Sequence, residues 1–165
     1  HGGGLFEYAK LSSIFEPINH TRKVIGFDTF EGFPSISSLD QKGSFSDLKE
    51  GGLRGSTLEE IEKSVKLYDL NRPLSHISKT ELVKGDITKS SFEYVKQHPS
   101  LVVALLYLDL DLYEPTKAAL EAFLPLMPCG GVIVFDELNA DIFPGETRAV
   151  DEVLGLGKIK IERFF

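Results

Sequence analysis

Two uninterrupted apolar runs constrain the fold of this chain more than any other feature: residues 101–108 and Val132–Phe135. Continuous hydrophobicity is typical of a strand buried on both faces, as in a parallel sheet covered by helices. Carboxylates follow both runs directly, Asp109 and Asp111 after the first and Asp136 and Glu137 after the second. The two runs therefore predict buried parallel strands that each end in acidic residues.

The segment between the two runs, residues 113–127, has helical periodicity. Tyr113, Leu120 and Phe123 fall on one face. Pro115 suits a first helical turn, and the Gly130-Gly131 pair favours termination. We therefore expect a strand–helix–strand unit, whose handedness brings both acidic ends to the edge of the sheet where ligands bind.

The rest of the chain continues this alternation. Further helices are expected over residues 5–16, after the capping box at Thr57, from Ser90 to about His98, and over Pro144–Leu154. Strands are expected over residues 23–28, 80–86 and 158–164. The order predicts an α/β fold with a doubly wound, mostly parallel, Rossmann-like sheet in a single domain over residues 1–165, incomplete at both ends. The first strand is the element expected to be missing.

Composition excludes several classes of protein. With 42% hydrophobic residues, the chain can form a core, and the net charge of −7 disfavours a nucleic-acid partner. No apolar run reaches the roughly 20 residues of a membrane span. A single cysteine, Cys129, favours a reducing, cytoplasmic setting. The sequence leaves a homo-oligomer open.

The N-terminal glycines, Gly2, Gly3 and Gly4, precede the first predicted helix. A glycine turn at a helix N-terminus suits an anionic or polar ligand. Asp28 ends the next predicted strand 24 residues after Gly4, near the spacing at which a Rossmann acid binds a ribose diol. An esterase also uses His-Gly-Gly-Gly, but the chain has no Gly-x-Ser-x-Gly motif. A nucleoside-type cofactor is the better interpretation.

Residues 29–55 form a long segment rich in Gly, Ser and Phe. Loops of this length inside compact domains are usually functional or disordered. Phe30, Phe33 and Phe45 argue against simple disorder. We predict a mobile lid that carries part of the acceptor site, with an ordinary surface excursion as the alternative.

Three motifs together resemble the macrocin O-methyltransferase family, a group of S-adenosylmethionine-dependent methyltransferases that act on sugar hydroxyls. The motifs are residues 24–34 (VIGFDTFEGFP), 108–116 (LDLDLYEPT) and 130–137 (GGVIVFDE). Their order and spacing agree with the family over nearly the whole chain. The resemblance implies a class I methyltransferase fold and O-methylation of a small-molecule hydroxyl, on a sugar or nucleotide sugar.

The resemblance also implies roles for individual residues. The cofactor S-adenosylmethionine would contact Gly2, Gly3, Gly4, Asp28, Thr29, Asp86, Ile87 and Asp109. The metal ligands would be Asp109, Asp136 and Glu137, holding Mg²⁺, and Asp111 would be the general base. Two residues depart from the family pattern: Leu110 replaces a usual Gly, and Glu137 replaces a usual Asp. The longer Glu side chain can still bind Mg²⁺ through oxygen but would shift the position of the ion.

The acidic cluster has a physical rationale beside the resemblance. A hydroxyl attacks a methyl sulfonium poorly until it loses its proton. A hard cation held by carboxylates lowers the pKa of the hydroxyl, and a neighbouring carboxylate can accept the proton. Adjacent carboxylates raise one another's pKa unless a cation compensates their charge.

Two other functions fit parts of the sequence. Asp109-x-Asp111 also suits a metal-dependent nucleotide-sugar glycosyltransferase, although only 54 residues follow Asp111. The chain could also be a non-catalytic cofactor-binding fragment. An ATPase is excluded, because Val132–Phe135 and the following acids have no accompanying Gly-x-x-x-x-Gly-Lys-[Ser/Thr]. The sequence does not identify the methyl acceptor.

Overall fold

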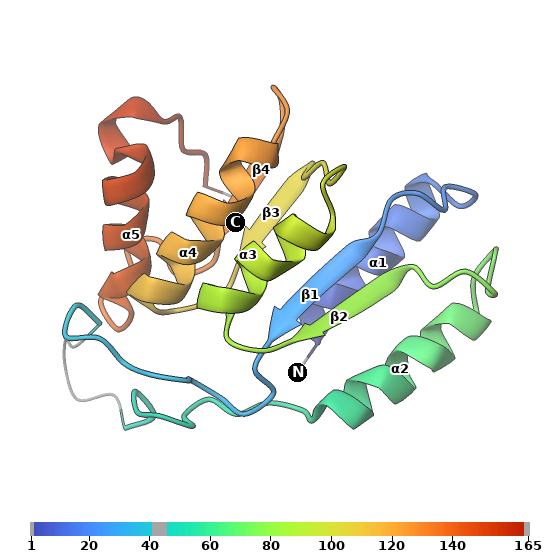
Figure 1. Ribbon diagram of the computed structural model, residues 1–165, viewed down its shortest axis with the longest axis horizontal. Helices are drawn as coiled ribbons and strands as arrows, with labels where there is room; N and C mark the ends of the chain where they lie inside the picture. Colours follow the sequence, from blue (N-terminus) through green and yellow to red (C-terminus); the bar gives the residue numbers. More distant parts are fainter. Residues whose placement is uncertain (1, 41–45, 164–165) are drawn as a thin grey trace. The chain divides into compact units, whose positions relative to one another are not determined.

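The structure is a computed structural model that describes residues 2–40 and 46–163. The chain divides into two compact units. Unit 1 contains His1–Pro34 and Gly51–Gly85, and unit 2 contains Ser35–Glu50 and Asp86–Phe165. Each unit is built around one pair of parallel strands (Figure 1). A single domain over residues 1–165 stays a prediction.

Unit 1 consists of two helices and two strands: α1 (Gly3–Phe15), β1 (Val24–Asp28), α2 (Leu58–Leu70) and β2 (Thr80–Lys84). The strands pair in parallel, with Val24 opposite Thr80 and Asp28 opposite Lys84. Helix α1 packs closely on β1, because a Cβ at Gly26 would lie 3.1 Å from Leu5 Cδ1. Glycine at position 26 therefore lets the helix approach the strand.

Helix α2 begins at the capping box expected from the sequence. The Thr57 hydroxyl accepts a hydrogen bond from Glu60 N, and the Glu60 carboxylate accepts one from Thr57 N at 2.8 Å. The pair satisfies two amides that have no partner inside the helix. Ile61, buried one turn later, lies beside Gly2 at the start of α1. The two helices of unit 1 therefore meet at their N-terminal ends.

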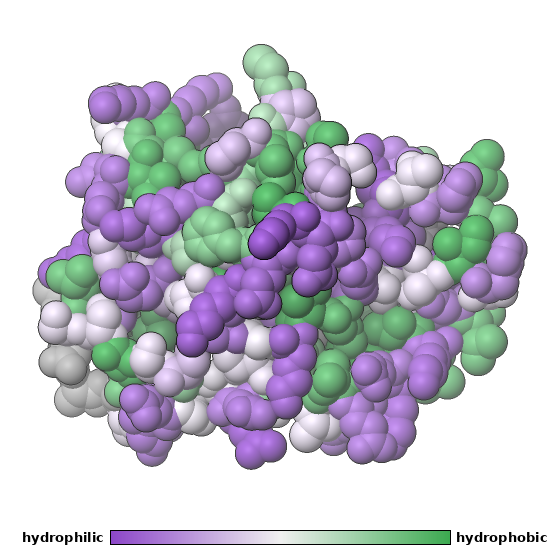
Figure 2. Space-filling view, in the orientation of Figure 1, coloured by the Kyte–Doolittle hydropathy of each residue, from purple (hydrophilic) through white to green (hydrophobic). Residues whose placement is uncertain are grey.

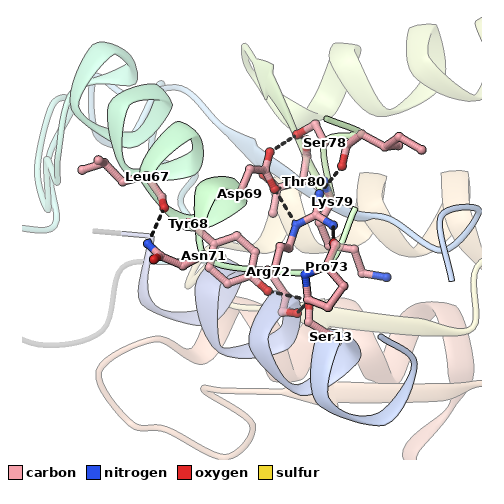
Figure 3. Close-up of polar contacts among 12 residues, drawn as sticks. Ser13, Leu67, Tyr68, Asp69, Asn71, Arg72, Pro73, Ser78, Lys79 and Thr80 are labelled. Atoms are coloured by element: carbon pink, nitrogen blue, oxygen red, sulfur yellow. Dashed lines mark hydrogen bonds and ion pairs between the residues drawn. The ribbon is translucent and has the colours of Figure 1, made fainter. Parts of the chain in front are cut away.

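Buried charges in unit 1 are compensated by a polar network between α2 and β2 (Figure 3). Asp69 accepts from Arg72 Nε at 2.7 Å and from Ser78 Oγ at 2.9 Å. The Arg72 guanidinium also donates to the carbonyls of Pro73 and Ile77. These bonds meet the requirement that a buried charge be paired. The network fixes the connection from α2 into β2.

Unit 2 consists of three helices and two strands: α3 (Ile87–Gln97), β3 (Leu105–Leu108), α4 (Tyr113–Phe123), β4 (Val132–Phe135) and α5 (Pro144–Leu154). Short 3₁₀ turns, η1 (Leu124–Leu126) and η2 (Leu156–Lys158), follow α4 and α5. Strands β3 and β4 pair in parallel. Helix α4 lies between α3 and α5 (Figure 1) and supplies much of the buried core, including Ala119 and Leu120.

The predicted α/β architecture with parallel strands is confirmed, and α5 has the predicted bounds. Two local predictions are wrong. Ser90 does not cap α3, because Asp86 is its N-cap and accepts from Thr88 N. Residues 158–163 contain no strand, and η2 covers their beginning; residue 164 lies outside the described part. Among the described residues, the paired strands are β1 with β2 and β3 with β4, and none of them pairs with this segment.

The long segment after β1 is closed at its base in unit 1. Phe33 N donates to Gly52 O at 3.1 Å, and Gly51 N donates to Phe33 O at 2.9 Å. Gly32 has a φ of 86°, and a Cβ there would lie 2.5 Å from Gly52 O. Only glycine fits this contact. The predicted lid over residues 29–55 is described except for residues 41–45, so Phe45 lies outside the described residues, and lid mobility stays a prediction.

The exposed surface of unit 1 includes large apolar side chains near the ends of its two helices: Ile14 and Phe15 of α1, and Leu67 and Leu70 of α2. Figure 2 shows green apolar surface among purple hydrophilic surface where these helices end. Cys129 is exposed and makes no disulfide with any described residue. No helix of residues 2–40 and 46–163 is long and apolar enough to cross a membrane.

Candidate functional site

The carboxyl ends of β3 and β4 bring acidic residues of unit 2 together. Leu108 and Phe135 are opposite each other in register, so Asp109 and Asp136 occupy the next position on the two paired strands. Asp136 N donates to Leu108 O at 3.1 Å, which extends the ladder by one residue. The Asp136 carboxylate accepts from the Tyr107 hydroxyl at 3.2 Å. The predicted meeting of the two acidic strand ends is confirmed.

Asp111 lies in a strained turn after β3. Its φ is 61°, in the left-handed region that non-glycine residues rarely adopt. Leu112 N donates to Leu110 O at 2.6 Å, so Asp111 is the middle residue of a three-residue turn. Such a conformation costs about 1–3 kcal/mol and persists only where the surroundings hold it. The chain leaves the extended conformation at this residue, contrary to a simple continuation of β3.

The carboxylates in this region raise one another's pKa. Burial and, to a lesser extent, the carboxylates of Asp109, Glu137 and Asp136 together raise the pKa of Asp111 to about 7. Burial also raises the pKa of Glu137, with Asp136 and Asp109 adding to the shift. A group with a pKa near neutrality can exchange a proton during a reaction. The cluster therefore contains a candidate general base at Asp111.

Glu146 of α5 belongs to the same cluster, although sequence analysis did not select it. Its side chain is fully buried, and its carboxylate accepts from Glu137 N at 3.0 Å through Oε1. Its Oε2 has no hydrogen-bond partner among the described residues. Burial raises its pKa, the bond from Glu137 N lowers it, and the carboxylates of Glu137, Asp111 and Asp136 raise it again, so that the pKa is about 8. A Glu in the first turn of a helix is a common feature, so only packing reveals this one.

The predicted metal ligands, Asp109, Asp136 and Glu137, supply the oxygen donors that Mg²⁺ prefers. The raised pKa of Glu137 also indicates excess negative charge that a cation would relieve. Among residues 2–40 and 46–163, however, no three His, Cys, Asp or Glu side chains are grouped to hold an ion. The oxygen donors are of the type that Mg²⁺ prefers, but the three side chains are not grouped closely enough to hold an ion.

Unit 1 contains the predicted glycine turn and ribose-binding residues. Gly2 is the N-cap of α1 with a φ of 76°, Gly3 and Gly4 form the first helical turn, and no side chain caps this end. Asp28 is exposed at the end of β1, where its Oδ1 accepts from Phe30 N at 2.6 Å. Thr29 donates from its hydroxyl to Gly32 O at 2.6 Å. Thr29 thus supports the turn that follows β1.

The predicted adenine-binding residues lie at the start of α3 in unit 2. Asp86 uses Oδ1 to accept from Thr88 N at 2.9 Å and from the Thr88 hydroxyl at 2.7 Å. Ile87 is the first residue of the helix and is half-buried. Asp86 therefore has a structural task at this position. The predicted cofactor residues are divided between the two units.

Comparison with protein families gives one match over most of the chain. Residues 6–160 match the family described as macrocin-O-methyltransferase (TylF). A search of curated proteins gives no match. The matched range contains the two acidic strand ends and Asp111, together with Asp28.

Solved structures of similar proteins agree with the fold. The chain is 34% identical to the calicheamicin methyltransferase CalS11, with a TM-score of 0.88 over 94% of this chain and 61% of that one. An apo structure of CalS11, described as a TDP-rhamnose 3'-O-methyltransferase, gives 32% identity and a TM-score of 0.76, covering 94% and 59%. The O-methyltransferase NovP, at 24% identity and a TM-score of 0.66, shares the fold over 92% and 58%. This chain thus spans about three-fifths of the structures that it matches.

Proposed function

Because this chain belongs to the macrocin O-methyltransferase family, we propose that it transfers a methyl group from S-adenosylmethionine to a hydroxyl of a sugar or nucleotide sugar. The observation that carries the proposal is the family match over residues 6–160, which includes the acidic ends of β3 and β4. Similarity to a TDP-rhamnose 3'-O-methyltransferase supports a nucleotide-sugar acceptor. Family membership also disfavours a glycosyltransferase.

The chemical requirement of the reaction is removal of a hydroxyl proton as the new C–O bond forms. We assign this proton to the Asp111 carboxylate. A base with a pKa of about 7 is partly ionised near neutral pH and still takes a proton effectively. Asp111 lies in a left-handed turn beyond the end of the β3 ladder. Glu146 supports the neighbouring strand end by accepting from Glu137 N.

The cofactor supplies an electrophilic methyl group on a positively charged sulfur. In our proposal the exposed amides at the start of α1, next to Gly3 and Gly4, bind its methionine carboxylate. Asp28 accepts from the ribose hydroxyls. Asp86 and Ile87 flank the adenine, and Thr29 keeps the turn after Asp28 in place.

The proposal also includes a bound metal ion. Asp109, Asp136 and Glu137 would hold Mg²⁺, which would lower the pKa of the acceptor hydroxyl when bound. The donor types support this assignment, and the side chains would have to gather around the ion. From the single cysteine we also propose a cytoplasmic location, and the proposal is compatible with a homo-oligomer.

Calorimetry tests the cofactor assignment most directly. Titration with S-adenosylhomocysteine should give a binding isotherm, because a methyltransferase binds this product and a glycosyltransferase does not. Asp28→Asn should weaken binding by roughly 1.5–3 kcal/mol, the range for a hydrogen bond involving a charged group. Asp47→Asn, which changes an exposed carboxylate, is the matched control. A chain that binds UDP-sugar but not S-adenosylhomocysteine would point instead to glycosyl transfer.

Methyl transfer itself is measured by mass spectrometry with S-adenosylmethionine and TDP-rhamnose. The expected product carries one additional methyl group on the sugar. Cofactor binding with no product from TDP-rhamnose or any other sugar hydroxyl would leave a non-catalytic cofactor-binding chain, and the proposed reaction would be wrong.

A further inference from the structure

Asp40 joins the segment after β1 to the core of unit 2. The residue is 2% exposed, and its carboxylate accepts two backbone hydrogen bonds. Oδ2 accepts from Ser37 N at 2.9 Å within the segment, and Oδ1 accepts from Tyr113 N at 2.7 Å in α4. Arg148 Nη1 of α5 adds a bond to Leu39 O at 2.8 Å. This end of the predicted lid is therefore fixed in unit 2.

The contact replaces a missing helix cap. Leu112, the N-cap of α4, has no side-chain oxygen to bind the first amides of the helix. Asp40, 73 residues earlier than Tyr113 in the chain, provides the oxygen, and its negative charge faces the positive end of the helix dipole. A buried carboxylate is thus compensated without a cationic side chain.

The start of α5 is shaped to admit this carboxylate. A Cβ at Gly145 would lie 2.1 Å from Asp40 Oδ1 and 2.5 Å from Tyr113 N. Any side chain at position 145 would therefore displace either the carboxylate or the first residue of α4. Segment, α4 and α5 meet at one closely packed point.

The same point lies next to the strained turn at Asp111. Leu108, before the turn, is held in the ladder with β4, and Leu112, after it, is fully buried. Tyr113 follows at once, with its amide bound by Asp40. Asp40 therefore fixes the C-terminal end of the strained turn at Asp111.

We propose that Asp40 is a positioning residue for Asp111: by binding the Tyr113 amide, it holds the Asp111 turn in shape and ties this turn to the segment Ser35–Asp40. The inference rests on the proposed function only for the role of Asp111 as base. Loss of Asp40 should misplace the base while leaving the assigned cofactor residues unchanged. Removal of the acceptor's proton would thereby depend on Asp40, a residue that contacts neither the acceptor nor the cofactor.

Hydrogen exchange in the ligand-free chain tests the structural half, with Asp40→Ala as the variant and Asp47→Asn as the control. The Leu112 amide closes the Asp111 turn, and the Tyr113 amide is the partner of Asp40. Both should exchange about tenfold faster or more in Asp40→Ala, because a hydrogen bond to a charged group is lost locally. The amide of Leu120, buried inside α4, should be unchanged.

Steady-state kinetics with S-adenosylmethionine and TDP-rhamnose test the functional half. Asp40→Ala should lower kcat by roughly 10–100-fold, as loss of an orienting partner usually does. The affinity for S-adenosylhomocysteine should stay within about twofold, below the range for a lost charged hydrogen bond. Gly145→Ala, which pushes on the same carboxylate from α5, should reproduce both effects. Glu121→Gln, at an exposed site on α4 outside the predicted lid, should retain the wild-type kcat.

The outcomes separate the inference from the proposed reaction. Unchanged exchange at the Leu112 amide would overturn the positioning role, because it would show that Asp40 does not stabilise the Asp111 turn. Equal acceleration at Leu112 and Leu120 would also overturn it, because it would show only a loss of global stability. Unchanged kcat in folded Asp40→Ala would overturn it as well. If the wild-type chain shows no methyl transfer but Leu112 and Tyr113 respond selectively, the reaction is wrong and the hold of Asp40 on the turn is supported.

Discussion

The two strand pairs of this chain resemble each other in architecture and differ in the groups that surround their charged side chains. Both are parallel, and acidic residues occur where strands end, Asp28 in unit 1 and Asp109 in unit 2. In unit 1, buried charges have partners: Asp69 binds Arg72, and the Lys79 ammonium donates to Asn19 O at 3.1 Å. In unit 2, Asp111 is surrounded by other carboxylates.

This difference separates charges that stabilise the fold from charges suited to chemistry. A compensated ion pair holds its protonation state and its geometry. A carboxylate surrounded by other carboxylates has a raised pKa, and its ionisation lowers the stability of the fold. Groups with such perturbed pKa values are concentrated at functional sites. The comparison therefore predicts that loss of charge should destabilise unit 1 and impair the reaction, rather than the fold, in unit 2.

The largest effect is expected for Asp111→Asn in the methyl transfer assay. Removal of the base should lower kcat by about 10²–10⁴-fold, the usual contribution of general base catalysis. Affinity for S-adenosylhomocysteine and the melting temperature should hardly change, because Asn resembles the protonated carboxyl. Asp141→Asn, at an exposed site in the same unit, is the control. Full turnover in Asp111→Asn would transfer the role of base to another carboxylate.

Arg72→Leu should be the most damaging charge removal for stability. The Arg72 and Asp69 side chains are 8% and 12% exposed, and loss of one member of a buried pair costs about 3–5 kcal/mol. Urea denaturation measures the free energy of unfolding. Arg22→Leu, which breaks an exposed pair with Glu16, should cost below about 1 kcal/mol. Equal costs for the two variants would contradict the distinction between buried and exposed pairs.

The pH dependence of stability should distinguish Glu146 from an ordinary surface acid. Its folded pKa of about 8 lies above the unfolded value of 4.5, so the folded state binds more protons between these limits. Its stabilising contribution is therefore complete below the unfolded pKa and is lost as pH rises through about 8. Asp111 acts in the same direction, with loss near pH 7.

The measurement is the melting temperature between about pH 6 and about pH 9 in the presence of a chelator. Glu146→Gln, which keeps an acceptor for Glu137 N, should reduce the fall in melting temperature as pH increases. Glu121→Gln, at an exposed site on α4, should leave the fall unchanged. An identical pH profile for Glu146→Gln and the wild type would show that Glu146 is ionised in the fold.

The smallest effect concerns Mg²⁺. If Asp109, Asp136 and Glu137 hold the ion, Mg²⁺ at roughly ten times its Kd should stabilise the chain by about 1–2 kcal/mol. Asp136→Asn should remove most of this gain, and excess Mg²⁺ should partly restore its turnover. Methyl transfer at the full rate in EDTA, together with no thermal shift, would eliminate the metal.

Sequence patterns predicted those parts of the molecule that depend on local chemistry. Continuous apolar runs located β3 and β4, and the acids that follow them located the cluster. The capping box at Thr57 marked the start of α2. Asp86 was predicted to end a strand and to contact the cofactor, and its role as the N-cap of α3 was missed, because a Gly-Asp pair fits both a strand end and a helix cap.

Residues whose role depends on distant contacts could not be found this way. Glu146 acquires its importance from burial beneath the end of β4, and Asp40 from a bond across 73 positions. Neither residue stands in an unusual local pattern. The outer strand expected over residues 158–164 was wrong over 158–163 for the converse reason, since its alternation was local and no strand of the described residues pairs with it.

The base of the segment after β1 has an evolutionary consequence. Backbone bonds of Phe33 with Gly51 and Gly52 close the two ends on each other, so we expect a change in the length of the span between them to leave β1 and α2 undisturbed. Lengthening a closed loop twofold costs only about 0.6 kcal/mol in entropy. If the span carries part of the acceptor site, as we predict, new acceptor preferences would arise by its replacement, provided that an acid equivalent to Asp40 still reaches the first amide of α4.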